Sequence, residues 1–186
     1  GGFLAVSWTD TVQATLMIFA LLITPVFVIL ALGDMGTAMD TIAAQDPSNF
    51  DMFKGLSFIA IISLLGWGLG YFGQPHILVR FMAADSVKTI PNARRIGMAW
   101  MILTLAGAVA VGFFGIAYFA GHPELAGPVS ENGERVFMEL VKILFNPWVA
   151  GIILSGVLAA VMSTLSAQLL VSSSALTQDF YKAFLR

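Results

Sequence analysis

The stretch ILFNPWVAGIILSGVLAAVMSTLSAQLLVSSSALTQ, residues 143–178, is the clearest indication of the fold class, because it holds no charged side chain over 36 residues. Three further runs without Asp, Glu, Lys or Arg cover residues 11–33, 55–79 and 96–123. Each run exceeds the roughly 20 apolar residues that an α-helix needs to cross a bilayer. The 186-residue chain is 58% hydrophobic and 11% charged, with a mean hydropathy of +0.88. The sequence therefore predicts an all-α integral membrane protein whose main partner is the lipid bilayer.

Charge and cysteine content exclude several classes of function. A net charge of −2 and a pI near 5.5 provide no basic surface for nucleic acid. The chain has no cysteine, which excludes disulfides, thiolate metal sites and cysteine nucleophiles. Neither H-E-x-x-H nor G-x-S-x-G occurs, so metalloprotease and esterase chemistry have no support. We therefore expect no enzymatic activity, no bound cofactor and no nucleic-acid partner.

The four apolar runs are long enough that length favours helices over strands. We expect one membrane domain over residues 1–186 with four transmembrane helices, at about 6–32, 54–80, 93–120 and 147–175. The chain opens with Gly rather than Met and stops just past a span, so we expect an internal piece of a longer, transporter-sized protein.

A shorter helix is expected between the third and fourth spans, over about residues 132–146. Charged side chains lie on one side of this segment, and apolar side chains recur on the other at Phe137, Leu140, Val141, Leu144 and Phe145. This spacing is typical of a helix that lies on the membrane interface, here the outer one.

The positions of Lys and Arg predict the orientation of the spans. The loop 80–95 holds four of them against one Asp, and the tail after the last span adds two more. The opposite side holds three, diluted by eight acidic residues. Positively charged loops favour the cytoplasm, so we expect loop 80–95 and both chain ends there.

The second span is interrupted at residues 66–75, which read GWGLGYFGQP. Four glycines and Pro75 weaken regular helical hydrogen bonding, and irregular backbone at membrane depth is tolerated where it lines a cavity. Trp67 and Tyr71 are four residues apart and would share one face, where they could form an aromatic wall for a small solute. Two other interpretations stay open: the glycines allow close helix packing, and the aromatic residues face lipid or core.

The fourth span carries Ser163 and Thr164 on a face of small residues. Two hydroxyls and the Ala160 carbonyl would offer three oxygens to a dehydrated monovalent cation. Ser and Thr in membrane helices also commonly bond back to the preceding turn and have no other role, which is the structural alternative.

Asp10 lies at the cytoplasmic end of the first span. Carboxylates just inside a span often mark ion paths, although the positive end of the helix dipole is also a sufficient reason for one there. The residue alone does not distinguish the two.

With these residues and motifs, the chain resembles the sodium/solute symporter family. The likeness runs through essentially all of the chain, from Gly1-Gly2-Phe3 to the segment 159–166. Gly-Gly-x-x-Ala followed by Thr-Asp marks the broad family. The stretch 67–76, Trp-Gly-x-Gly-Tyr-Phe-Gly-Gln-Pro-His, points to its proline-carrying branch.

The resemblance implies a five-plus-five inverted repeat of the leucine-transporter type, with the four spans as core helices 5–8. Core helix 1, in the missing remainder of the same chain, would complete the sodium site. Ala160, Ser163 and Thr164 would be the helix 8 half of that site, and Asp10 would lie on the sodium exit path. The residues that would face L-proline are Trp67, Tyr71, Pro75 and, as a weaker candidate, Gln74.

The implied function is sodium-coupled symport of L-proline into the cell by alternating access, in the bacterial cytoplasmic membrane. Two alternatives are kept: a symporter for another small solute, and a transporter-like sensory input domain of a membrane histidine kinase. The sequence that follows this chain would distinguish the second alternative, because a kinase domain would lie there.

Overall fold

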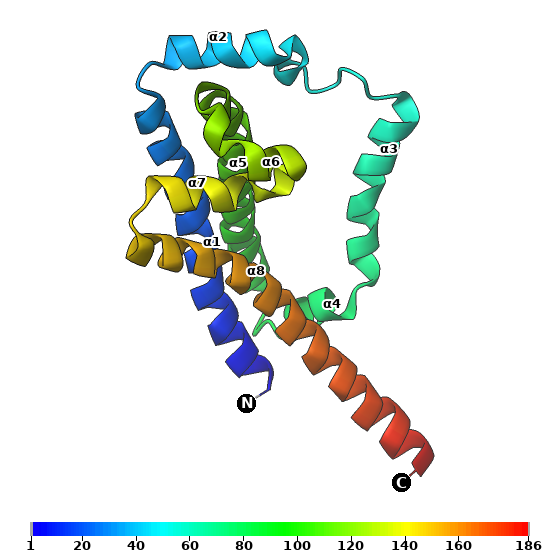
Figure 1. Cartoon of the computed structure of the whole chain (residues 1–186). Helices are drawn as coiled ribbons and strands as arrows, with labels where there is room; N and C mark the ends of the chain where they lie inside the picture. Colours follow the sequence, from blue (N-terminus) through cyan, green and yellow to red (C-terminus); the bar gives the residue numbers. More distant parts are fainter. Residues whose placement is uncertain (1, 186) are drawn as a thin grey trace.

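The computed structural model describes residues 2–185, which fold into helices and short connections with no strand in that range (Figure 1). The α-helices are α1 (Phe3–Leu32), α2 (Met35–Gln45), α3 (Phe58–Gly66), α4 (Pro75–Met82), α5 (Ile90–Gly121), α6 (Gly127–Glu131), α7 (Val136–Leu144) and α8 (Pro147–Ser174). Short 3-10 segments are η1 (Pro47–Phe50), η2 (Trp67–Gly73), η3 (Val87–Thr89), η4 (Pro123–Leu125) and η5 (Gly133–Arg135), and a π-helix, η6, covers Ala175–Leu185.

Three helical segments are long and apolar enough to cross a membrane: Phe3–Leu32, Val87–Gly121 and Pro147–Phe184. A fourth candidate consists of Phe58–Gly73 and Pro75–Met82, which meet at a bend of 57°. The chain is therefore all-helical with three spans, or four if the bent pair is one span. The exact boundaries of the spans in a bilayer stay a prediction.

Small residues bring α5 and α8 close to α1. A Cβ added to Gly107 of α5 would collide with the carbonyl oxygen of Leu21 on α1. A Cβ on Gly156 of α8 would lie 3.1 Å from the Cβ of Ala20. Because lipid provides little hydrophobic driving force for helix association, the van der Waals contacts that such close approach allows contribute directly to helix packing. Helix α1 is thus held between two partners at adjacent positions.

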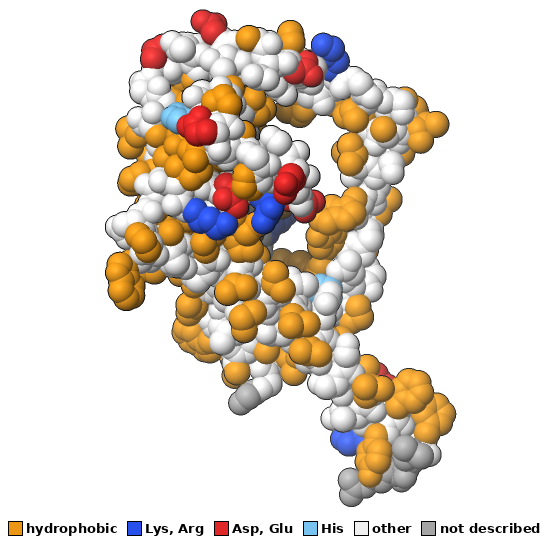
Figure 2. Space-filling model, in the orientation of Figure 1, with side chains coloured by type: hydrophobic (Ala, Val, Ile, Leu, Met, Phe, Trp, Pro, Cys, Tyr) orange, Lys and Arg blue, Asp and Glu red, His pale blue; other side chains and the backbone are white. Residues whose placement is uncertain are grey.

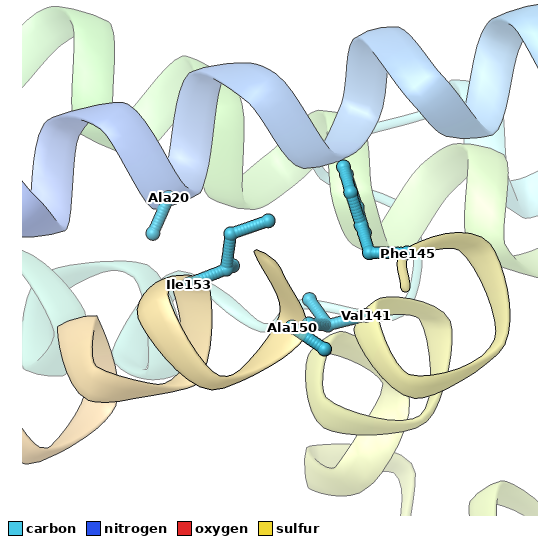
Figure 3. Packing of buried hydrophobic residues seen from close by; sticks show 5 residues of the cluster. All are labelled: Ala20, Val141, Phe145, Ala150 and Ile153. Carbon is cyan, nitrogen blue, oxygen red and sulfur yellow. The ribbon is translucent and has the colours of Figure 1, made fainter. Parts of the chain in front are cut away.

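Helix α7 packs across α1, α5 and α8. Its side chains Leu140 and Val141 are 0% exposed. Val141 and Phe145 form one buried cluster with residues of α1 and α8, namely Ala20, Ala150 and Ile153 (Figure 3). Leu140 belongs to a second cluster that includes Val28 and Val111. The apolar spacing of this segment therefore serves packing against three helices, while its position at the outer interface stays a prediction.

The predicted interruption of the second span is confirmed. Helix α3 ends at Gly66, the next seven residues form the 3-10 segment η2, and Gln74 has an extended backbone (φ −86°, ψ 115°). Pro75 then occupies the first turn of α4, where its missing N–H costs no helical hydrogen bond. Helix α3 stands apart from α1 and α5 (Figure 1), and Figure 2 shows an opening between them.

Helix α2 follows α1 through a capped turn. Asp34 is the N-cap, and its Oδ2 accepts hydrogen bonds from the backbone N–H and the hydroxyl of Thr37, at 2.7 and 2.6 Å. These bonds stabilise the ionised carboxylate and so lower the pKa of Asp34. The four aspartates of the segment 34–53 thus include one with a clear structural role.

Candidate functional site

A cavity of about 600 Å³ lies between α1, α4, α5, α8 and the broken segment η2. This volume falls in the range of about 300–1,000 Å³ that is usual for small-molecule sites. Its lining residues are Asp10, Ala14, Met17, Tyr71, His76, Ile77, Arg80, Phe81, Trp100, Ser163, Thr164 and Ala167. Four residues that the sequence singled out therefore border one space: Asp10, Tyr71, Ser163 and Thr164.

The aromatic pair of the broken span is only partly in this cavity. The rings of Trp67 and Tyr71 meet edge to face, with centroids 5.0 Å apart and planes at 83°. Tyr71 borders the cavity, whereas Trp67 is 72% exposed and does not. Among the described residues 2–185, Trp67 thus contacts a cavity-lining side chain, Tyr71, but does not line the cavity itself.

The two residues after the aromatic pair lie elsewhere. Pro75 borders a separate cavity of about 450 Å³, together with residues at the start of α1 and the end of α8. Gln74, its neighbour, borders neither cavity in the part of the chain that the structure describes. Gln74 and Pro75 therefore do not border the cavity that Tyr71 borders, although the backbone N–H of Gln74 donates a hydrogen bond to the carbonyl oxygen of Tyr71 at 3.3 Å.

On α8, the hydroxyl of Ser163 donates a hydrogen bond to the carbonyl oxygen of Ala160 at 3.0 Å. This is the local bond of the structural alternative. It uses the proton of the hydroxyl and leaves oxygen lone pairs free, so the bond is compatible with a cation on the other side of the oxygen. Thr164 borders the same cavity, while Ala160 borders a smaller one of about 210 Å³ between α1 and α8.

Asp10 forms an ion pair with Arg80 across 70 residues of sequence. One guanidinium nitrogen of Arg80 (Nη2) lies 2.6 Å from Oδ2 of Asp10, so α1 and α4 are joined at the edge of the cavity. The Asp10 side chain is 14% exposed and that of Arg80 is 51% exposed. Sequence reasoning missed this role of Arg80, because it counted the residue only as a loop charge. No local pattern reports a partner so distant in sequence.

Trp100 is a second residue that the sequence analysis did not single out. Its indole N–H donates to the carbonyl oxygen of Ala14 at 3.2 Å and ties α5 to α1 beside the cavity. The sequence feature that could have identified Trp100 is an indole N–H within an apolar span, since a buried Trp N–H needs a hydrogen-bond acceptor.

Acidic and histidine side chains provide no metal centre in this cavity. Among residues 2–185, no three of the His, Asp and Glu side chains are grouped so that they could hold a metal ion. Hydroxyl and carbonyl oxygens with one nearby carboxylate suit a weakly held, hard monovalent cation instead.

Comparison with known proteins gives consistent matches along the whole chain. The model of the sodium:solute symporter family matches residues 1–186. The sodium/proline symporter of Escherichia coli is 72% identical over 186 residues, which are 100% of this chain and 37% of the relative. The sodium/proline symporter of Haemophilus influenzae is 60% identical over 190 residues, 100% of this chain and 38% of the relative.

A more distant relative is the high-affinity proline transporter PutP of Bacillus subtilis. It is 52% identical over 186 residues, covering 100% of this chain and 38% of that protein. The chain thus spans little more than a third of the length of these relatives. No solved structure gives a significant match. With its three or four candidate spans, the chain is part of a multi-pass membrane protein.

Proposed function

Because the chain belongs to the sodium:solute symporter family, we propose that it forms part of a carrier that couples L-proline uptake to sodium entry. The observation that carries this proposal is the cavity of about 600 Å³, which an aromatic side chain of the broken span shares with two hydroxyls of α8. A solute and a cation bound in one space are positioned to couple their binding energies. The names of the bacterial relatives support proline as the solute.

In the proposed site, the ring of Tyr71 contacts the apolar ring of proline and Trp67 supports Tyr71 from behind. Such aromatic surfaces bind small apolar rings and ammonium groups. Pro75 and, as a weaker candidate, Gln74 are also proposed to face the solute, and they lie at the bend between η2 and α4. Broken helices at such positions are a common feature of solute sites in secondary transporters.

The sodium ion is proposed to bind at Ser163, Thr164 and the carbonyl of Ala160. The hydrogen bond from Ser163 holds its oxygen beside this carbonyl. Three oxygens are fewer than a dehydrated cation requires, so the remaining ligands would come from core helix 1 elsewhere in the same chain. This fragment by itself should not transport.

Asp10 is proposed to receive the ion on its way to the cytoplasm. Its carboxylate borders both the main cavity and a narrower one toward the start of α1, so it lies between them. The ion pair with Arg80 would then compete with sodium for the same carboxylate. A leaving ion would be held only briefly, because Arg80 restores the pair.

The proposed architecture is the five-plus-five inverted repeat, with α1, the α3–α4 limb, α5 and α8 as core helices 5–8. Both ends of the chain and the loop 80–95 would face the cytoplasm. In the cysteine-free chain, Asp40→Cys and Ser130→Cys should be labelled by an impermeant reagent from outside, and Ile90→Cys only from inside. Labelling of Ile90→Cys from outside intact cells would invert this orientation.

The function is tested by proline uptake into vesicles that contain the full-length protein. An inward sodium movement across about 100 mV releases about 2.3 kcal/mol, and a tenfold sodium gradient adds about 1.4 kcal/mol. Their sum of about 3.7 kcal/mol sustains roughly 500-fold accumulation of a zwitterion that moves no net charge. Accumulation that ignores the sodium gradient would overturn the proposal. Competition by other small solutes tests the alternative substrates, and a kinase domain in the full-length sequence would favour the sensor.

A further inference from the structure

Two side-chain oxygens on α1 are buried without a hydrogen-bond partner among residues 2–185: Oδ1 of Asp10 and Oε1 of Gln13. The two residues are three apart, so they lie on one face of the helix. Buried acceptors are nearly always satisfied in native folds, so an unsatisfied one needs an explanation, and a bound water or ion is a common one. The other oxygen of Asp10, Oδ2, is held by Arg80, so this ion pair fixes the carboxylate and leaves its Oδ1 without a partner.

The contact between α1 and α8 places Gln13 along the seam of these helices. The helices run in opposite directions, and Ala20 lies against Gly156 where they cross (Figure 1). Seven residues make almost two helical turns, so a step of seven keeps the same face. Stepping back from Ala20 leads to Gln13, and stepping forward from Gly156 leads to Ser163. Gln13 and Ser163 therefore occupy matching levels of the seam.

One more step of the same register agrees with the structure. It leads to Val6 on α1 and Leu170 on α8, which border one narrow cavity together with Asp10. In this register, Gln13 lies at the level of Ser163, next to Thr164, and Asp10 lies one turn nearer the start of α1. Residues with side-chain oxygens therefore occur at two neighbouring levels of the seam.

We propose that the amide oxygen of Gln13 binds the sodium ion transiently as the ion moves from the α8 hydroxyls to Asp10. This inference rests on the proposed function and assigns a residue to the step between ion binding and ion exit. An amide oxygen is a neutral, hard ligand that a sodium ion accepts in place of water. Because the amide oxygen bears no charge, it binds the sodium ion less strongly than a carboxylate would. The ion can therefore leave it quickly for the next ligand. Its burial without a donor leaves its lone pairs available.

The test uses the full-length protein in vesicles and compares Gln13→Met with Gln45→Met. Methionine has nearly the shape of glutamine but lacks the amide oxygen, and Gln45 is an exposed residue at the end of α2 that serves as the matched control. Sodium-driven proline uptake should fall at least about tenfold in Gln13→Met, because the ion loses one ligand between its binding site and Asp10 and the barrier to its exit rises. The sodium concentration for half-maximal proline binding at equilibrium should stay within about twofold, since the binding site itself is intact.

Gln13→Asn keeps an amide oxygen on a shorter side chain and should recover part of the lost rate. Uptake by Gln13→Met that equals uptake by Gln45→Met would overturn the inference. So would an equal loss of binding and uptake that Gln13→Asn does not relieve, because that pattern indicates packing alone. Gln13→Leu also lacks the oxygen and gives the same comparison if Gln13→Met does not reach the membrane. A wild-type protein without sodium-driven uptake would instead overturn the proposed function, a result distinct from these two.

Discussion

Replacing Ser163 by alanine distinguishes two roles for this residue: a sodium ligand, or a serine that only donates a hydrogen bond to its own helix. The structure provides a matched control on the same helix, because Ser155 donates to the carbonyl of Ile152 at 2.6 Å, three residues back, just as Ser163 donates to Ala160 at 3.0 Å. Ser163 borders the cavity of about 600 Å³, and Ser155 is not among its lining residues. If the local bond were the whole role of Ser163, the two alanine variants would behave alike.

The expected magnitude follows from the loss of one oxygen from an ion that has already shed water. A hydrogen-bonding or ligand contact to a charged group contributes about 1.5–3 kcal/mol, which corresponds to about a 10- to 150-fold rise in half-saturating sodium. Proline uptake by the full-length protein is measured over a range of sodium concentrations. Ser163→Ala should show this rise, Ser155→Ala should resemble the wild type, and Ser163→Thr should retain more function than Ser163→Ala.

Apparent proline affinity should also fall in Ser163→Ala at low sodium, because coupling between two binding events is reciprocal. The same should hold for Thr164→Ala, and saturating sodium should reduce the defect in both variants. Wild-type sodium dependence in both Ser163→Ala and Thr164→Ala would refute the assignment of sodium to α8. The hydroxyls would then serve packing only.

Three further perturbations test the site and the fold. Tyr71→Ala should weaken proline binding about 5- to 30-fold, which corresponds to the loss of an aromatic contact of about 1–2 kcal/mol. Trp67→Ala should weaken proline binding less, because Tyr71 borders the cavity and Trp67 does not. If proline titrations of both variants equal that of the wild type, the solute binds elsewhere. Gly107→Ala should destabilise the helix packing by about 1–3 kcal/mol, because the added methyl group collides with the backbone of α1. Gly112→Ala should have little effect, because its added methyl group has no neighbour within 4 Å. Thermal melting of the two purified variants measures the difference. The lowered pKa of Asp34 means that its cap stabilises α2 above about pH 3.8 and that this stabilisation is lost as the pH falls through the folded-state pKa. The protection factors of the α2 amides in hydrogen exchange, which are corrected for the intrinsic exchange rate at each pH, should therefore fall in acid, and Asp34→Asn should remove this dependence.

Several features of the fold could be predicted from the sequence because their causes are local. Charge-free runs report their own burial in lipid, since a charge at the bilayer centre is costly wherever the chain folds. The break at residues 66–75 was likewise predictable, because glycine and proline act on their own backbone. The rings of Tyr71 and Trp67 do meet, as predicted, but the prediction assumed α-helical spacing and did not foresee the 3-10 geometry of η2.

The helical character, the apolar spans and the place where one of them is interrupted can thus be predicted from local sequence. Which side chains meet depends on the packing of the helices: Arg80 reaches Asp10 across 70 residues, and Pro75 lines a different cavity from Tyr71. These contacts depend on helix register, which no local pattern encodes. Hydropathy reports that a helix is buried in lipid, but the close contacts at Gly107 and Gly156 set how α5 and α8 are rotated and shifted along α1, and that choice places every oxygen of the candidate site.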